Sequence, residues 1–199
     1  MKQLASAEVT NKKAIDIDQR FGIMNKWTFL MMQAFEARSF LDLAESTHRI
    51  SPKSSMKELL TQLALFKAFL LSYGKCFSSA GKGRSKLEEK HVFVDRGDLL
   101  IIHHRIMALR NTFAAHNDMS GLDDAILDIK ETEDEFILSH RYAFAIPLNE
   151  YEEYKKCTQV LEEYLFDKTN KAVDSLQKQL GNKDETRLNR HVGSISRKA

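Results

Sequence analysis

The most regular alternation of apolar and polar positions covers residues 98–118, DLLIIHHRIMALRNTFAAHND. Apolar residues recur there at steps of three and four, which places them on one face of an α-helix: Leu99, Ile102, Ile106, Leu109 and Phe113. The same stripe continues to His116, and the neighbouring face carries a mixed set: His103, Met107, Arg110, Ala114 and Asn117. Because a polar group buried without a partner is costly, these polar side chains either satisfy one another or face a cleft.

Helical periodicity also covers residues 24–48, 55–76 and 149–180. The first of these is apolar on two faces, which predicts packing on two sides. The second leaves little polar surface and should be the most buried helix. Ser55 and Glu58 fit a capping box at its start, with Ser51 before Pro52 as an alternative. The helix at 149–180 has a narrow apolar stripe and should lie on the outside of the bundle. Asp95 or Asp98 is the expected N-cap of the helix at 98–118.

The period changes between residues 125 and 147, where β-branched and aromatic residues form two runs around an acidic turn. This pattern predicts a β-hairpin, and because a lone hairpin is marginal in water we expect it to pack on the bundle or on a partner. The predicted fold is all-α, an up-and-down bundle of about four long helices with this hairpin inserted before the last helix.

Length and composition favour one helical domain at residues 23–181, between a polar segment at 1–22 and a basic, disordered tail at 182–199. The chain is 43% hydrophobic and 29% charged, which is typical of a soluble globular protein. Its net charge of +2 is too small to indicate nucleic acid by itself. Two distant cysteines indicate reduced thiols. Without a signal peptide or an apolar run of roughly 20 residues, we expect a cytoplasmic protein that does not enter the membrane.

No motif for zinc, nucleotide or nucleophilic chemistry is present, so the sequence predicts no cofactor and no metal site. The loop at 78–94 is basic but lacks the glycine spacing of a P-loop. Its cations can contact phosphates, or the loop is simply solvated; the candidates are Lys82, Arg84 and Lys86.

Residues 109–116, LRNTFAAH, resemble the Arg-polar-x(3–5)-His signature of the HEPN superfamily. The AHND ending and the flanking helix are most similar to the bacterial abortive-infection (AbiU-like) branch. The resemblance implies an all-α bundle, commonly dimeric, in which arginine and histidine from two facing helices form a metal-independent ribonuclease site. By position, the catalytic residues would be Arg110, Asn111 and His116. His103 and Asn117 are candidates for substrate binding, because they share the face of Arg110.

The chemistry suits these residue types. RNA supplies its own nucleophile, the 2′-hydroxyl, and cleavage through it leaves a 2′,3′-cyclic phosphate. Histidine can move a proton at neutral pH, and arginine can hold two phosphate oxygens. Residues six apart lie about 120° apart around a regular helix, so Arg110 and His116 meet more easily across a two-fold axis than on one helix. A homodimer is therefore expected.

Three hypotheses follow. The chain is a metal-independent endoribonuclease, such as a toxin or phage-defence effector with a cognate antitoxin or another protein partner. Alternatively it is a non-catalytic, dimeric helical binding module of the same family, acting through RNA or proteins. In the third, the fold is unrelated and the spacing accidental, with Arg110 paired to an acid and His116 satisfied in the core.

Overall fold

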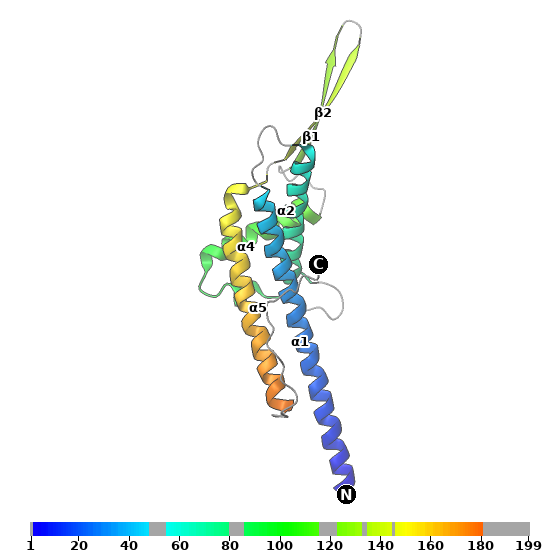
Figure 1. Cartoon of the computed structure of the whole chain (residues 1–199), viewed down its shortest axis with the longest axis vertical. Helices are drawn as coiled ribbons and strands as arrows, with labels where there is room; N and C mark the ends of the chain where they lie inside the picture. Colours follow the sequence, from blue (N-terminus) through cyan, green and yellow to red (C-terminus); the bar gives the residue numbers. More distant parts are fainter. Residues whose placement is uncertain are drawn as a thin grey trace, which may run out of the picture. The chain divides into compact units, whose positions relative to one another are not determined.

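The computed structural model describes residues 2–47, 55–79, 86–115, 123–132, 135–144 and 146–180 (Figure 1). The helices are α1 (Lys2–Ser46), α2 (Met56–Phe77), α3 (Glu89–Val92), α4 (Gly97–Leu109) and α5 (Tyr151–Leu180). A π-helix, η1 (Arg110–Ala115), continues α4, and a 3-10 turn, η2 (Leu148–Glu150), precedes α5. The strands are β1 (Asp123–Glu131) and β2 (Phe136–Phe144). The predicted class, an all-α bundle with one hairpin before the last helix, is confirmed.

Two elements differ from the sequence prediction. The first helix begins at Lys2 rather than near residue 24, and residues 2–21 contain neither glycine nor proline to interrupt it. The segment 78–94 is not only a loop, because α3 forms within it. Residues 182–199, predicted to be a disordered tail, lie outside the described residues.

The chain divides into two compact units, and the divisions fall inside α1 and α5. One unit combines residues 1–27 with 167–199, and the other spans Thr28–Phe166. The first contains the buried Leu176 of α5. The second contains the helix bundle, the hairpin and the described part of the predicted site.

The core of the Thr28–Phe166 unit is formed by α1, α2, α4 and α5. Phe66 of α2 stacks against two rings of α5, with centroid distances of 5.9 Å to Tyr151 and 6.3 Å to Tyr154. The expected burial of α2 is confirmed for a set of its large residues: Leu63, Phe66, Phe69, Leu70 and Tyr73. α2 therefore provides the central wall against which α4 and α5 pack.

Polar contacts join these helices. Arg38 of α1 pairs with Glu162 of α5 at 2.7 Å. Gln62 Nε2 of α2 donates to the carbonyl of Ala44 in α1 at 3.3 Å. The two cysteines are free, as expected, and both are buried in this core.

The sequence predicted the N-cap of α2 correctly and the N-cap of α4 wrongly. The capping box that starts α2 is confirmed: the amide of Glu58 donates to Ser55 Oγ, and the amide of Ser55 donates to the Glu58 carboxylate. For α4 both predicted caps are wrong, because the N-cap is Arg96, without a side-chain bond. Asp95 instead adopts a left-handed conformation (φ 57°), which turns the chain sharply between α3 and α4.

The hairpin is a regular antiparallel pair in which Ile129 faces Leu138. One of its faces carries four apolar side chains that are 51–67% exposed: Leu127, Ile129, Phe136 and Leu138. Of the two predictions for the hairpin, packing on the bundle is not met by these four residues, and packing on a partner stays a prediction. No described helix combines the length and apolar character needed to cross a membrane.

Candidate functional site

The helix that carries the Arg-Asn motif is not regular throughout. α4 ends at Leu109, and Arg110 to Ala115 continue as a π-helix. The expectation of a single α-helix over 98–118 is therefore wrong for Arg110–Ala115. π segments are rare and often occur at functional sites. His116 and Asn117 lie outside the described residues.

Arg110 is held closely against α2. A Cβ atom added at Gly74 would lie 2.9 Å from Arg110 Cγ and 3.2 Å from its Cδ, so the absence of a side chain at Gly74 makes this approach possible. Arg110 Nη1 donates to Asn111 Oδ1 at 2.9 Å. Its Nε is buried and finds no acceptor among the described residues, none of whose acids pairs with it. Arg110 Nε is thus a buried donor whose partner is not supplied by the described residues.

A cavity of about 530 Å³ lies beside this pair. It brings together three of the predicted site residues, Lys86, His103 and Asn111, with its other walls from α2, the α3 segment and α4. The further lining residues are Phe77, Leu87, Glu88, Glu89, His104, Met107 and Ala108. Lys82 and Arg84 lie outside the residues that the structure describes.

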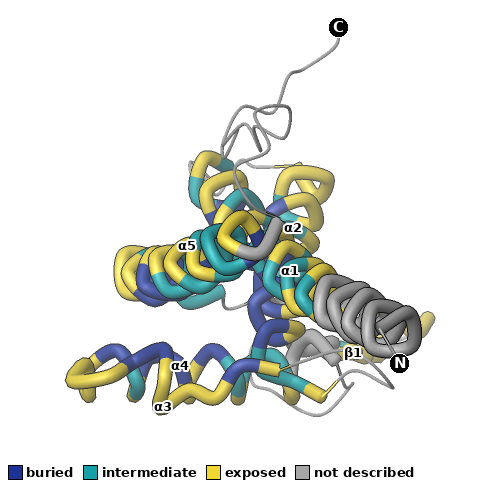
Figure 2. The backbone as a smooth tube through the Cα atoms, turned by 90° about the horizontal axis from the view of Figure 1, so that it is seen from below, coloured by how far each residue is buried: buried dark blue, intermediate teal, exposed yellow. Residues whose placement is uncertain are grey.

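His103 is enclosed in the wall of this cavity, with only 2% of it exposed. Its Nδ1 lies 2.9 Å from the hydroxyl of Tyr73, and its Nε2 lies 3.1 Å from Glu89 Oε2. The ring of Phe77 meets it edge-on at a centroid distance of 4.4 Å. The exposed His104 reaches the same Glu89 oxygen through its own Nε2, at 3.2 Å. Figure 2 shows the neighbouring elements, with buried positions along α4 and exposed positions along α3.

Burial determines the protonation of this cluster. It lowers the pKa of His103 from 6.5 to about 4, although Glu89 opposes the shift. Burial also raises the pKa of Tyr73 well above 10.0, and the hydrogen bond from His104 lowers the pKa of Glu89. At neutral pH His103 is therefore an uncharged ring between a protonated phenol and an ionised carboxylate. Its Nε2–H donates to Glu89, and its Nδ1 accepts from Tyr73.

Lys86, the described one of the three basic residues predicted to contact phosphates, lies at the rim of the cavity, where Glu88 partly neutralises its charge. Its ammonium is 3.6 Å from a carboxylate oxygen of Glu88, and both side chains are half exposed. The rim of the cavity thus mixes charges, which weakens the electrostatic attraction it offers to an anion.

Sequence reasoning missed four residues of this region. Tyr73 and Gly74 fit the core pattern of α2, Glu89 falls in a segment predicted as loop, and His104 had no partner. Adjacent helical residues point about 100° apart, so nothing in the pattern indicates that His103 and His104 converge on one carboxylate. The one sequence feature that could have indicated this cluster is the adjacent pair His103 and His104.

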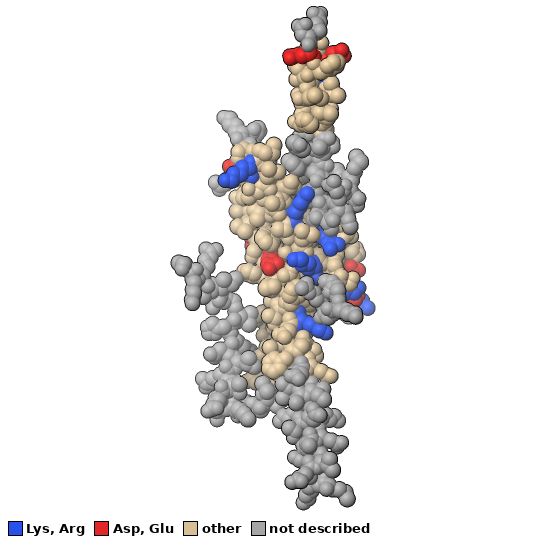
Figure 3. Space-filling view, turned by 90° about the vertical axis from the view of Figure 1, so that its right-hand side faces the viewer, with Lys and Arg blue, Asp and Glu red and all other residues tan. Residues whose placement is uncertain are grey.

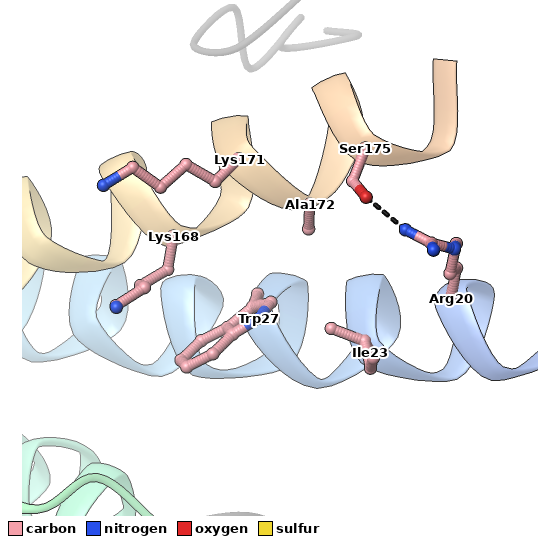
Figure 4. Close-up of a pocket in the computed structure, with 7 residues that line it drawn as sticks. All are labelled: Arg20, Ile23, Trp27, Lys168, Lys171, Ala172 and Ser175. Atoms are coloured by element: carbon pink, nitrogen blue, oxygen red, sulfur yellow. Dashed lines mark hydrogen bonds between the residues drawn. The ribbon is translucent and has the colours of Figure 1, made fainter. Parts of the chain in front are cut away.

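A second hollow, of about 290 Å³, lies in the unit formed by residues 1–27 and 167–199. Figure 4 shows α1 and α5 facing each other there, with Arg20 donating to Ser175 and Trp27 opposite Lys168. Lys171 is bonded to Asp167 at 2.7 Å. This hollow contains no residue of the Arg-Asn motif, so the candidate site is assigned to the cavity beside α4.

Comparison of the chain with protein-family models, curated proteins and solved structures finds no match. The class that fold and site define is an all-α bundle with an arginine-asparagine pair beside a polar cavity. The resemblance to the HEPN superfamily therefore rests on the motif and on the helical fold alone.

Proposed function

We propose that this protein is a HEPN-type, metal-independent endoribonuclease that acts as a homodimer. One observation carries the proposal. Arg110, held over Gly74 and bonded to Asn111, keeps a buried N–H without an acceptor among the described residues, beside a cavity that Asn111 lines. A fixed guanidinium with unused donors is suited to bind a phosphate.

In this proposal the two non-bridging oxygens of the scissile phosphate bind Arg110, and Asn111 fixes the guanidinium. His116 of the facing subunit moves the proton between the 2′-hydroxyl and the leaving 5′-oxygen. The products are a 2′,3′-cyclic phosphate and a free 5′-hydroxyl. His103 supports the cavity wall, because protein groups occupy both of its nitrogens. Lys86 contacts a neighbouring phosphate at the rim.

The dimer is part of the proposal because residues six apart lie about 120° apart around a regular helix, so Arg110 and His116 meet more easily from two facing helices. A partner helix related by a two-fold axis supplies the second group. A role as a toxin or phage-defence effector, with a protein antitoxin, is consistent with such an activity.

A non-catalytic binding module is the second candidate, and a specific observation favours it. Glu88 and Glu89 line the same cavity, and Glu88 pairs with Lys86, which lowers the attraction for a polyanion. On the face drawn in Figure 3, most of the described Lys and Arg side chains gather loosely over the middle, with uncharged surface between them.

Cleavage of RNA in the presence of EDTA, followed by analysis of the product ends, tests the proposal. Arg110→Ala and His116→Ala should each abolish cleavage and leave the dimer folded. Arg105→Ala is the matched control, since this exposed arginine of α4 pairs with Glu150 at 3.4 Å and does not line the cavity. It should cleave as the wild type does.

Cleavage that persists in purified Arg110→Ala protein would exclude the assigned role. A folded wild-type dimer that binds RNA but releases no cyclic phosphate would favour the binding module. Light scattering coupled to size-exclusion chromatography gives the oligomeric state in each case.

A further inference from the structure

Three side chains with metal-binding atoms meet in the wall of the cavity. Glu89 comes from α3, and His103 and His104 come from α4. Each offers one ligand atom, and these atoms all lie within 4.8 Å of one another. The Glu89 oxygen lies 3.1 Å from Nε2 of His103 and 3.2 Å from Nε2 of His104.

We propose that Glu89, His103 and His104 form a binding site for Zn²⁺. Two imidazoles and one carboxylate are a ligand set that zinc takes, with a fourth position left for water or another ligand. All three residues line the cavity of about 530 Å³, so the fourth position opens toward it. The site goes beyond the proposed ribonuclease activity, which needs no metal.

The ligand types, two imidazole nitrogens and one carboxylate oxygen, favour zinc over cations that prefer oxygen. Ligand atoms bound tetrahedrally at about 2.0–2.1 Å lie about 3.3 Å from one another. The two nitrogen–oxygen distances, 3.1 and 3.2 Å, are within a few tenths of an ångström of that value. The two histidine nitrogens are bounded only by the 4.8 Å limit, so the exposed His104 has to move toward His103 for the ion to enter. Calcium and magnesium, by contrast, prefer oxygen ligands throughout.

The hydrogen bond from Tyr73 prepares His103 for this role. When zinc binds Nε2, the proton of the neutral ring moves to Nδ1, which then donates to the Tyr73 oxygen. The 2.9 Å contact is kept, because a phenol hydroxyl can donate or accept. Such a partner behind a histidine ligand orients the ring and typically increases metal affinity.

Aromatic packing fixes the position of the same ring. His103 lies 4.4 Å from the centroid of Phe77 and 5.1 Å from that of Phe93. Glu89 and His104 are 46% and 57% exposed, so the open side of the cluster can be reached from solvent. One ligand is thus rigid and two can adjust.

Zinc titration of the full-length protein tests the proposal. The protein is treated with EDTA, dialysed, and titrated with Zn²⁺ in competition with a chromophoric chelator; Co²⁺ absorption reports the coordination number. Wild-type protein should bind Zn²⁺ through this cluster. Glu89→Gln and His104→Gln should each lower the affinity by about tenfold or more. Both side chains are exposed, so these variants should remain folded, which circular dichroism checks.

His91→Gln is the matched control, because His91 is exposed on the same short helix as Glu89 but is not part of the cluster. It should bind zinc as the wild type does. Wild-type affinity in either cluster variant, or an equal loss in His91→Gln, would overturn the proposal, as would absence of binding to the wild type. Because the readout is metal occupancy, these outcomes leave the proposed ribonuclease activity untouched.

Discussion

Two adjacent residues of α2 organise the site in different ways. Tyr73 supplies a buried hydroxyl to His103, and Gly74 supplies the space that Arg110 occupies. The two residues are adjacent in the chain. Tyr73 acts through its hydroxyl, and Gly74 acts through its lack of a side chain. Although the sequence of α2 is that of a buried core helix, α2 also positions polar side chains of α4 and of the π-helix that follows it.

Tyr73→Phe should lower the free energy of unfolding by about 1–3 kcal/mol, because Nδ1 of the buried His103 loses its partner. Urea unfolding at pH 7.5 measures the change. Tyr151→Phe is the control: the Tyr151 hydroxyl is buried and has no hydrogen-bond partner within the described part of the chain. Its removal should be neutral or slightly stabilising. Equal losses in the two variants would contradict the role given to the Tyr73 hydroxyl.

Gly74→Ala should impair the proposed RNA cleavage by up to about 10²-fold, because the new methyl group displaces the Arg110 side chain. Alanine is the better helix former by about 1 kcal/mol, so the fold should survive. Single-turnover cleavage and circular dichroism measure both effects. Gly97→Ala is the control, since a Cβ there meets nothing within 4 Å. If a folded Gly74→Ala variant cleaves RNA as fast as the wild type, the close approach of Arg110 to Gly74 is not needed for cleavage.

At the scale of elements, the hairpin contrasts with the helices. Its strands are paired in regular register, but the apolar side chains of one face are exposed. The packed face of α2 behaves in the opposite way, because Phe66, Phe69, Leu70 and Tyr73 are fully buried. Met56, Leu60 and Leu71 of the same helix are exposed. Substitutions in the two elements should therefore have very different effects on the stability of the fold.

The double substitution Ile129→Thr and Leu138→Thr should change the free energy of unfolding by no more than about 0.5 kcal/mol. These residues face each other across the hairpin, are 62% and 60% exposed, and are replaced by a residue that suits strands. Leu70→Ala in α2, at 0% exposure, should cost about 2–5 kcal/mol. Urea unfolding followed at 222 nm compares them. A loss from the threonine pair as large as that from Leu70→Ala would show that the hairpin supports the bundle.

At the scale of the whole molecule, both of its thiols are internal to the bundle. Cys157 Sγ donates to the carbonyl of Leu99 at 3.4 Å, which links α5 to α4, and Cys76 lies against the carbonyl of Leu30 in α1. Burial raises the pKa of both from 9.0 to about 12. The reactivity of the Cys76 and Cys157 thiols therefore reports whether the bundle is closed.

Neither cysteine should react with iodoacetamide in the native protein at pH 8, and both should react in urea. A rise of the pKa from 9.0 to about 12 lowers the thiolate fraction at this pH roughly a thousandfold. Because the folded state favours the protonated thiols, their contribution to stability is complete below pH 9 and is lost as pH rises from about 9 toward 12. Mass spectrometry counts the labelled thiols. Rapid native labelling at pH 8 would indicate an open core.

The sequence by itself determined the local features. The capping box at Ser55, the helical face of Leu99, Ile102 and Ile106, and the hairpin strands all follow from interactions between residues close in sequence. The Arg110–Asn111 hydrogen bond also joins adjacent residues, but the sequence did not predict it. The full length of α1 was missed because residues 2–22 have weak apolar periodicity, although nothing in their sequence stops a helix.

Only the tertiary structure decided which elements meet. Periodicity identifies the buried face of a helix but not the group that the neighbouring helix presents to it. The burial of His103, its bond to Tyr73 and the convergence of His104 on Glu89 depend on that juxtaposition, as does the space at Gly74 for Arg110. The π-helical turn at Arg110 likewise has no periodic signal of its own, because it departs from the 3.6-residue repeat on which the sequence prediction was based.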